Sequence, residues 1–173
     1  MAKETPDTIF LEEATKEVEV AITRVALLHL AFSKTLVQEM GEDRGKSLIV
    51  KAIMEYGDLI AKFISRGGKD LPSFGMSKDV STNDDGHLTV KGCTINNVFK
   101  QFDEMDLGRL YCLVDAAKTM ATDLSRKIIH STCEACGDAN CTFDNLSTTE
   151  EERNDFLNRH DNWKKVDPRL TRE

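Results

Sequence analysis

Four of the five cysteines of this chain lie between residues 107 and 145, where reactive side chains are most concentrated. Asp115 follows Cys112 by three residues, so on a helix the thiol and the carboxylate would project from one face within about 6 Å of each other. A carboxylate raises the pKa of a neighbouring thiol, so we expect Asp115 to orient a substrate amine or a water molecule rather than to activate Cys112. The alternative is structural: Cys112 packs and Asp115 bonds the backbone.

The fifth cysteine, Cys93, stands between a predicted strand over residues 87–91 and a short predicted helix over residues 96–102. Backbone N–H groups and the helix dipole at such a junction lower the pKa of a thiol and make it nucleophilic. A buried, unreactive cysteine is the alternative for Cys93.

Cys133, Cys136 and Cys141 have a spacing similar to that of zinc ligands. The residues around them predict a hairpin with strands over 126–132 and 141–143, in which a four-residue loop places Cys136 opposite Cys141.

In that register His130, Cys136 and Cys141 share one face, whereas Cys133 points to the other. A regular hairpin therefore cannot aim Cys133 and Cys136 at one ion, and only a knuckle-like turn at 134–135 would do so. Thiolate catalysis without a metal is thus the first expectation. A zinc or iron–sulfur site, with His130 or Cys112 as an additional ligand, is the alternative.

Composition narrows the class of protein. With 173 residues, 40% of them hydrophobic, the chain predicts one globular domain, and its net charge of −7 argues against nucleic acid and anionic membranes as partners. We expect no apolar run of about 18 residues and no signal peptide, and so a cytoplasmic protein whose cysteines are thiols or metal ligands.

Hydrophobic periodicity predicts an α+β fold. Two amphipathic helices, from Thr8 to about Met40 and over residues 42–64, precede an irregular loop over 69–85. A change to two-residue periodicity near residue 86 then predicts strands, interrupted by a helix over 106–121. We expect two antiparallel N-terminal helices packed on a small antiparallel sheet that contains the C-terminal hairpin.

The chain divides into a helical part (1–68), a part that carries the site (69–147) and a C-terminal helix and tail (148–173). The apolar stripe of the first helix runs for about 45 Å, longer than a small domain covers by itself, and predicts a homodimer through that helix.

Three motifs in this order resemble the family named for L-2-amino-thiazoline-4-carboxylic acid hydrolase. They are Gly92-Cys93, LGRLYCLVD at 107–115 and CGDANCTF at 136–143, and the resemblance covers roughly residues 35–145. The hairpin motif is also similar to that of the 4-vinyl reductase domain. Thr94 stands where the family usually has proline, and Cys133 and Cys136 are additions of this chain.

The resemblance implies a hydrolase that opens a cyclic amidine, a C–N bond in a small carboxylated heterocycle. Its thiolate would be Cys93 or Cys112, Asp115 would hold the amidinium and His130 would carry the proton. Lys91, Lys100 or Arg109 would bind the substrate carboxylate.

Two other functions remain open. The thiols of Cys93, Cys112 and Cys141 could instead hold a metal that activates water. A non-enzymatic protein that binds a small molecule or a metal, such as a sensor or carrier, would use the same cysteine-lined pocket.

Overall fold

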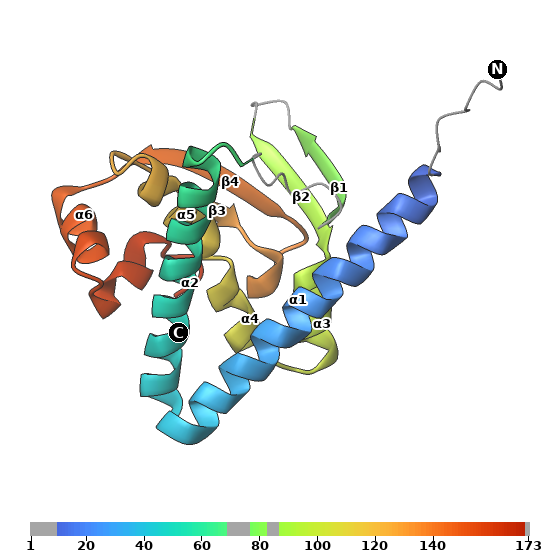
Figure 1. The fold of residues 1–173 in the computed structure, drawn as a ribbon, viewed down its shortest axis with the longest axis horizontal. Helices are drawn as coiled ribbons and strands as arrows, with labels where there is room; N and C mark the ends of the chain where they lie inside the picture. The colour runs from blue at the N-terminus through green and yellow to red at the C-terminus, as the bar shows by residue number, and fades with distance from the viewer. Residues whose placement is uncertain (1–9, 69–76, 83–86, 172–173) are drawn as a thin grey trace, which may run out of the picture.

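The computed structural model describes residues 10–68, 77–82 and 87–171, and it has the α+β architecture that the sequence predicts (Figure 1). Its two long helices, α1 (Leu11–Met40) and α2 (Glu42–Ser65), run in opposite directions along the arms of a V. Gly41 joins them with φ of 77°, a backbone conformation that favours glycine. The cap expected near Thr8 lies outside the described residues.

Among the described residues, the sheet has four antiparallel strands in the order β1-β2-β4-β3. They are β1 (Ser77–Thr82), β2 (Leu88–Cys93), β3 (Arg126–Thr132) and β4 (Cys141–Ser147). Strand β1 corrects part of the expected irregular loop: residues 77–82 have little intrinsic strand preference, but they pair along the whole of β2. The remainder of that loop that lies at 69–76 and 83–85 is outside the described residues.

Between β2 and β3 the described chain forms three short helices: α3 (Thr94–Gln101), α4 (Met105–Tyr111) and α5 (Val114–Thr122). Helix α5 packs between α2 and β3. The contact with α2 is close, because a Cβ atom at Gly57 would lie only 2.5 Å from the Cβ atom of Ala117.

The prediction of a single helix over 106–121 is wrong. The chain makes a tight turn at Cys112 and Leu113, whose N–H groups bond three residues back, to Arg109 and Leu110. Both residues keep helical dihedral angles, so the apolar spacing continues through the break and conceals it in the sequence. The turn places Cys112 at the end of α4 and Asp115 in the first turn of α5.

The expected hairpin register is also wrong. Thr132 pairs with Thr142 and His130 with Phe143, with an irregularity between His130 and Thr132. Cys136 does not face Cys141, because residues 134–136 form a 3-10 turn, η1 (Glu134–Cys136). The hairpin therefore has an irregular turn at the position where the sequence analysis requires one for Cys133 and Cys136 to face a single ion.

The C-terminal segment contains α6 (Glu150–Leu157) and the 3-10 helix η2 (Asp161–Val166). Thr149 and Glu152 form the capping box at the start of α6. Trp163, Val166 and Leu170 are buried in the core, so the tail is part of the packed structure.

By length and composition alone, helix α1 is long enough and apolar enough to cross a membrane, with a mean hydropathy of 1.5 over its most apolar 18 residues. This corrects the expectation that no segment is apolar over about 18 residues. Only 17% of that window is buried inside the structure. One such helix near the N-terminus is weak evidence for a membrane span.

Candidate functional site

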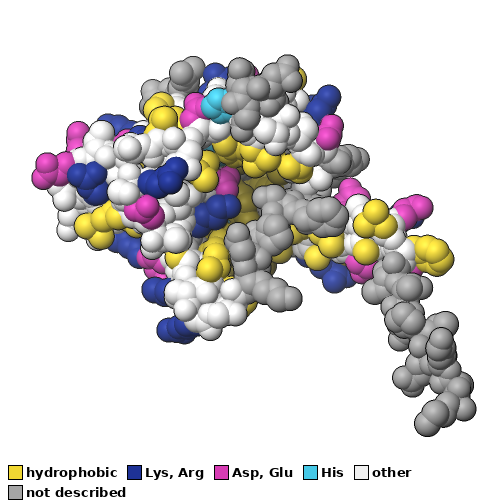
Figure 2. Space-filling view, turned by 90° about the horizontal axis from the view of Figure 1, so that it is seen from above, with side chains coloured by type: hydrophobic (Ala, Val, Ile, Leu, Met, Phe, Trp, Pro, Cys, Tyr) yellow, Lys and Arg dark blue, Asp and Glu magenta, His cyan; other side chains and the backbone are white. Residues whose placement is uncertain are grey.

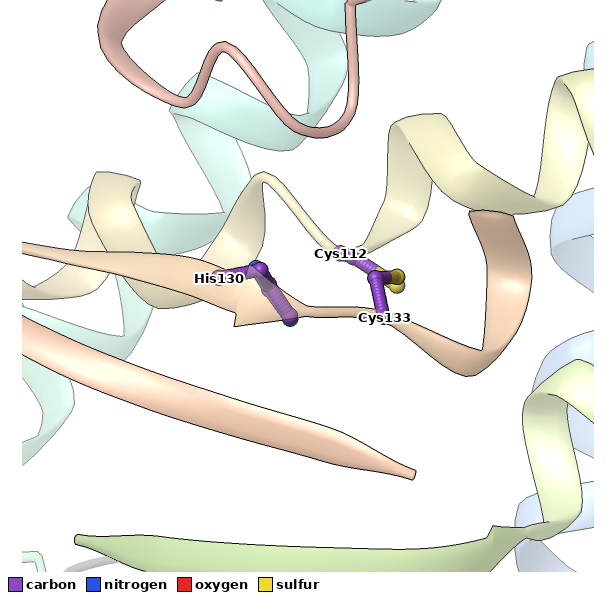
Figure 3. Close-up of side chains that lie close together, drawn as sticks. All are labelled: Cys112, His130 and Cys133. Atoms are coloured by element: carbon purple, nitrogen blue, oxygen red, sulfur yellow. The ribbon is translucent and has the colours of Figure 1, made fainter. Parts of the chain in front are cut away.

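Three potential metal ligands converge where the α4–α5 turn meets the hairpin. The sulfur atoms of Cys112 and Cys133 and a ring nitrogen of His130 lie within 4.8 Å of one another (Figure 3). Tetrahedral zinc with Zn–S bonds of about 2.3 Å would place two sulfur atoms about 3.8 Å apart, so small side-chain movements would close this cluster on an ion. We call Cys112, His130 and Cys133 the triad.

Within the triad, Cys133 is the thiol best suited to lose its proton. Its side chain is fully buried, and hydrogen bonds from the thiols of Cys112 and Cys136 lower the pKa of Cys133. The same hydrogen bonds, together with burial, raise the pKa of Cys112 and Cys136. Hydrogen bonding among these three thiols thus favours loss of a proton from Cys133 over loss from Cys112 or Cys136.

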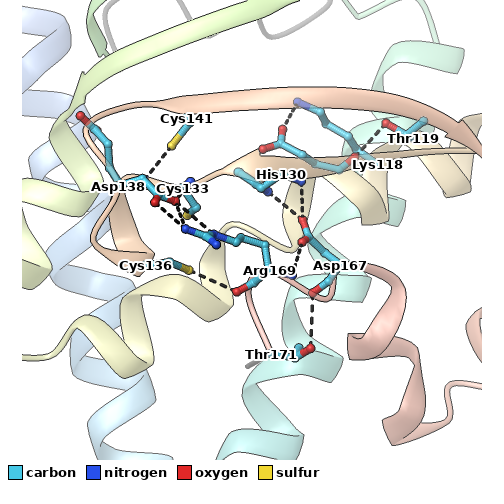
Figure 4. Close-up of polar contacts among 12 residues, drawn as sticks. Lys118, Thr119, His130, Cys133, Cys136, Asp138, Cys141, Asp167, Arg169 and Thr171 are labelled. Atoms are coloured by element: carbon cyan, nitrogen blue, oxygen red, sulfur yellow. Dashed lines mark hydrogen bonds and ion pairs between the residues drawn. The ribbon is translucent and has the colours of Figure 1, made fainter. Parts of the chain in front are cut away.

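The backbone of Cys133 is held by a separate ion pair. Asp138 accepts a hydrogen bond from the Cys133 N–H at 2.7 Å, and its carboxylate also binds the guanidinium of Arg169. Arg169 comes from the C-terminal tail, so the tail supports the turn that positions Cys133 (Figure 4).

His130 is held by Asp167, a residue that sequence analysis did not identify. The Asp167 carboxylate accepts hydrogen bonds from the His130 backbone N–H at 2.9 Å and from Nδ1 at 2.8 Å. Burial alone would lower the pKa of His130, but the hydrogen bond and charge of Asp167 raise it on balance. With Nδ1 bound to a carboxylate, Nε2 is the nitrogen that has a lone pair for a metal or a substrate.

Two further cysteines border the triad, and they differ in how their sulfur atoms are used. The sulfur of Cys141 accepts the Glu134 backbone N–H at 3.2 Å, as a metal-bound thiolate would. The Cys136 thiol instead donates to the Arg169 carbonyl oxygen at 3.4 Å. Of the two, Cys141 is the better fourth ligand.

Cys93 stands at the junction that the sequence predicts, at the end of β2 and directly before α3. The N–H groups of Gly92 and Cys93 donate to the Glu134 carboxylate at 2.9 and 3.0 Å. The expected lowering of the thiol pKa is wrong: burial outweighs the hydrogen bonds from the N–H groups of Ile95 and Asn96 and raises the pKa of Cys93. This environment favours the thiol over the thiolate.

A cavity of about 610 Å³ adjoins the triad. Its walls come from the helices α1 to α5, the turn η1 and the sheet, and they are mainly apolar. Figure 2 shows a hollow lined with hydrophobic side chains. Of the predicted site residues, the structure brings five to this cavity, namely Cys93, Cys112, Asp115, His130 and Cys141. Such a volume and lining suit a small organic molecule.

The predicted carboxylate-binding residues do not line the cavity. Lys91 is exposed on β2, and Arg109 forms an ion pair with Asp106 at 3.3 Å. Among the described residues the lining contains Lys118, which sequence analysis missed and which pairs with Asp115 at 2.8 Å. The spacing of Asp115 and Lys118 on one helix was a signal that could have identified this pair.

No family model matches this chain, and neither a curated protein nor a solved structure is significantly similar to it.

Proposed function

We propose that this protein binds a small apolar molecule in the cavity and holds a zinc ion beside it through the triad. The observation that carries the proposal is that the half-buried thiol of Cys112, the buried thiol of Cys133 and the imidazole of His130 converge, and that Cys112 and His130 line a wall of the cavity. Asp167 orients that imidazole as a carboxylate orients a zinc-bound histidine.

The ligand atoms of the triad favour zinc over magnesium and calcium. Sulfur and imidazole ligands in tetrahedral arrangement suit zinc, whereas magnesium and calcium require oxygen ligands. Cys141 would complete a closed site with four protein ligands. If Cys141 did not bind, the fourth position would be available to a molecule in the cavity, and zinc would supply a Lewis acid there.

Zinc content of protein purified without oxygen tests this proposal. We expect one zinc per chain, and loss of zinc in Cys112→Ser and Cys133→Ser. Cys136→Ser is the matched control, because it removes a neighbouring thiol that donates to a carbonyl and is expected to keep the metal. A metal-free wild type, or equal zinc loss in all three variants, would refute the triad as a metal site.

The second candidate is hydrolysis of a cyclic amidine, as the family resemblance implies. His130 and Asp115 both line the cavity, which supports their roles as proton carrier and amidinium partner. Two observations weigh against it: the pKa of both Cys93 and Cys112 is raised, and the lining is apolar for a small carboxylated heterocycle.

Mass spectrometry of 2-aminothiazoline-4-carboxylate incubated with the protein tests the hydrolase directly. Ring opening adds one water to the substrate, and Asp115→Asn is expected to abolish it while the circular dichroism spectrum stays unchanged. An unchanged substrate at high protein concentration would leave binding as the function.

The cytoplasmic location expected from the sequence stays a prediction.

A further inference from the structure

Seven apolar residues of α1 follow a strict alternation of three- and four-residue steps. In heptad notation the a positions are Leu11, Val18, Val25 and Phe32, and the d positions are Ala14, Ala21 and Leu28. We call these seven residues the seam. Its large members are solvent-exposed, with exposed fractions of 71% for Leu11, 58% for Leu28 and 64% for Phe32.

The seam lies beside the face of α1 that packs on the protein, and its residues Ala14 and Val18 are half-buried. The buried residues of α1 are Ala26, Leu30 and Ser33, which lie on a neighbouring stripe of the helix. In Figure 1 the N-terminal half of α1 projects beyond the other described elements. An isolated helix of that length is marginally stable in water, so a partner along the seam would stabilise it.

We propose that a second copy of this chain packs antiparallel along the seam as a two-stranded coiled coil. An a/d repeat over about three heptads is the sequence pattern of a coiled coil. From Leu11 to Phe32 the seam is about 32 Å long at 1.5 Å per residue. The proposal is independent of the metal site.

Side-chain size favours the antiparallel arrangement. When Val18 faces the partner's Ala21, Val25 faces the partner's Ala14 and Leu11 faces the partner's Leu28. Each alanine then meets a valine, so large and small residues alternate across the interface. A parallel dimer would instead place alanine against alanine in two layers.

Charge favours the same arrangement. Glu17 and Arg24 occupy g positions beside the seam, and in this antiparallel register Glu17 faces the partner's Arg24. Two-fold symmetry forms this pair twice. In a parallel dimer a g position faces an e position, and Glu17 would face the partner's Ile22, with no charge to pair.

The proposed interface reaches the cavity. Ile22 and Val25 belong both to α1 and to the cavity lining, and Val25 is 43% exposed. The partner's helix would therefore cross the cavity beside Val25 and contribute its Ala14 to that wall. On this proposal the ligand site is complete only in the dimer.

Sedimentation velocity over a range from 1 to 100 µM, with charge reversals, tests both association and orientation. We expect wild type to dimerise, and Glu17→Arg and Arg24→Glu to weaken dimerisation by about tenfold each by placing like charges together. The double variant restores opposite charges only in an antiparallel dimer, so it should dimerise as wild type does. Glu13→Arg, on the outer face of α1, is the matched control and should have no effect.

Three outcomes would overturn the proposal. The first is a monomer at 100 µM, and the second is a dimer that both single reversals leave unchanged or that the double reversal fails to restore. The third is co-sedimentation of wild type with vesicles of neutral phosphatidylcholine to an extent that Leu28→Asp abolishes, which would assign the seam to a lipid surface.

Discussion

The carboxylate of Asp167 is the most consequential single group near the triad, because it accepts two hydrogen bonds from His130. Both side chains are almost completely buried, so bulk solvent does not compete for the hydrogen bond between them. Pro168 follows directly and restricts Asp167 to an extended conformation, which the structure shows with φ of −116°.

Asp167→Asn is expected to weaken zinc binding by about 10- to 100-fold, because an amide holds the imidazole tautomer less firmly than a carboxylate does. Titration of the apoprotein with zinc against a chromophoric chelator measures the affinity. Asp161→Asn is the control: it is the same change in the same tail, at a residue that pairs with Ser47 and Lys51 away from the triad. Equal affinities for wild type and Asp167→Asn would show that Asp167 does not support a metal ligand.

At the scale of residues, the sequence identified the thiols and His130 but predicted the wrong direction for the pKa of Cys93. Local rules for Cys93 predict a lowered pKa, whereas burial, which depends on the packing of distant elements, raises it. Asp167 could not be found because 37 residues separate it from His130 and no motif relates the two. Such a pair becomes visible only when the tail is placed against β3.

At the scale of elements, the contact between α2 and α5 depends on Gly57. A glycine inside a helix is ordinarily less favourable than alanine by roughly 0.5–1 kcal/mol. At Gly57 the added methyl group would meet the Ala117 carbonyl carbon at 2.7 Å, and backbone cannot move aside as a flexible side chain can.

We therefore predict that Gly57→Ala destabilises the fold by about 1–3 kcal/mol, the usual effect of overpacking. Urea denaturation followed by circular dichroism measures the change. A stabilising effect of Gly57→Ala would contradict this prediction, because it would mean that α2 and α5 are farther apart than in this structure.

The start of α6 carries a pH-dependent contribution to stability. Glu152 accepts the Thr149 N–H and binds the buried Lys127 of β3. Burial would raise the pKa of Glu152, but the hydrogen bond from Lys127 and that from the Thr149 N–H lower it on balance. A lowered carboxyl pKa stabilises the fold above the unfolded value of about 4.3 and loses this contribution as pH falls through the folded value.

Glu152→Gln is accordingly expected to destabilise the protein by about 1–3 kcal/mol at pH 7, since it leaves a buried ammonium group without its carboxylate. The difference from wild type should shrink as pH falls below about 4. Denaturation at several pH values measures this, and Glu151→Gln, in the same exposed turn, should show a much smaller difference. A difference that is constant with pH would mean that the ion pair does not stabilise the fold.

Elements with a strong sequence pattern were predicted, whereas β1, which is fixed by pairing alone, was not. The stripes of α1 and α2 repeat over many residues and dominate any local preference. Strand β1 has no such pattern and exists because β2 offers it a pairing edge. The turn at Cys112 retains helical spacing, so only its three-residue hydrogen bonds distinguish it from a continuous helix.

At the scale of the molecule, the triad connects parts of the chain that are distant in sequence. Cys112 ends α4, His130 belongs to β3 and Cys133 precedes η1, while Asp167 supports the cluster from the tail. An ion that binds these groups in the folded state alone stabilises it by RT ln(1 + [Zn]/Kd), about 4 kcal/mol at a thousandfold excess over Kd. For a chain of this length that corresponds to a rise in Tm of about 8 to 16 °C.

Removal of zinc with a chelator should therefore lower Tm by that amount in differential scanning calorimetry, and restoring zinc should reverse the change. Because the ligands come from separate elements, the whole molecule should gain stability and unfold in one transition with the metal bound. Cys112→Ser should have the same Tm with and without zinc, whereas Cys136→Ser should retain the zinc-dependent rise. A rise that persists in Cys112→Ser would mean that zinc binds elsewhere, and its position would then have to be sought outside the triad.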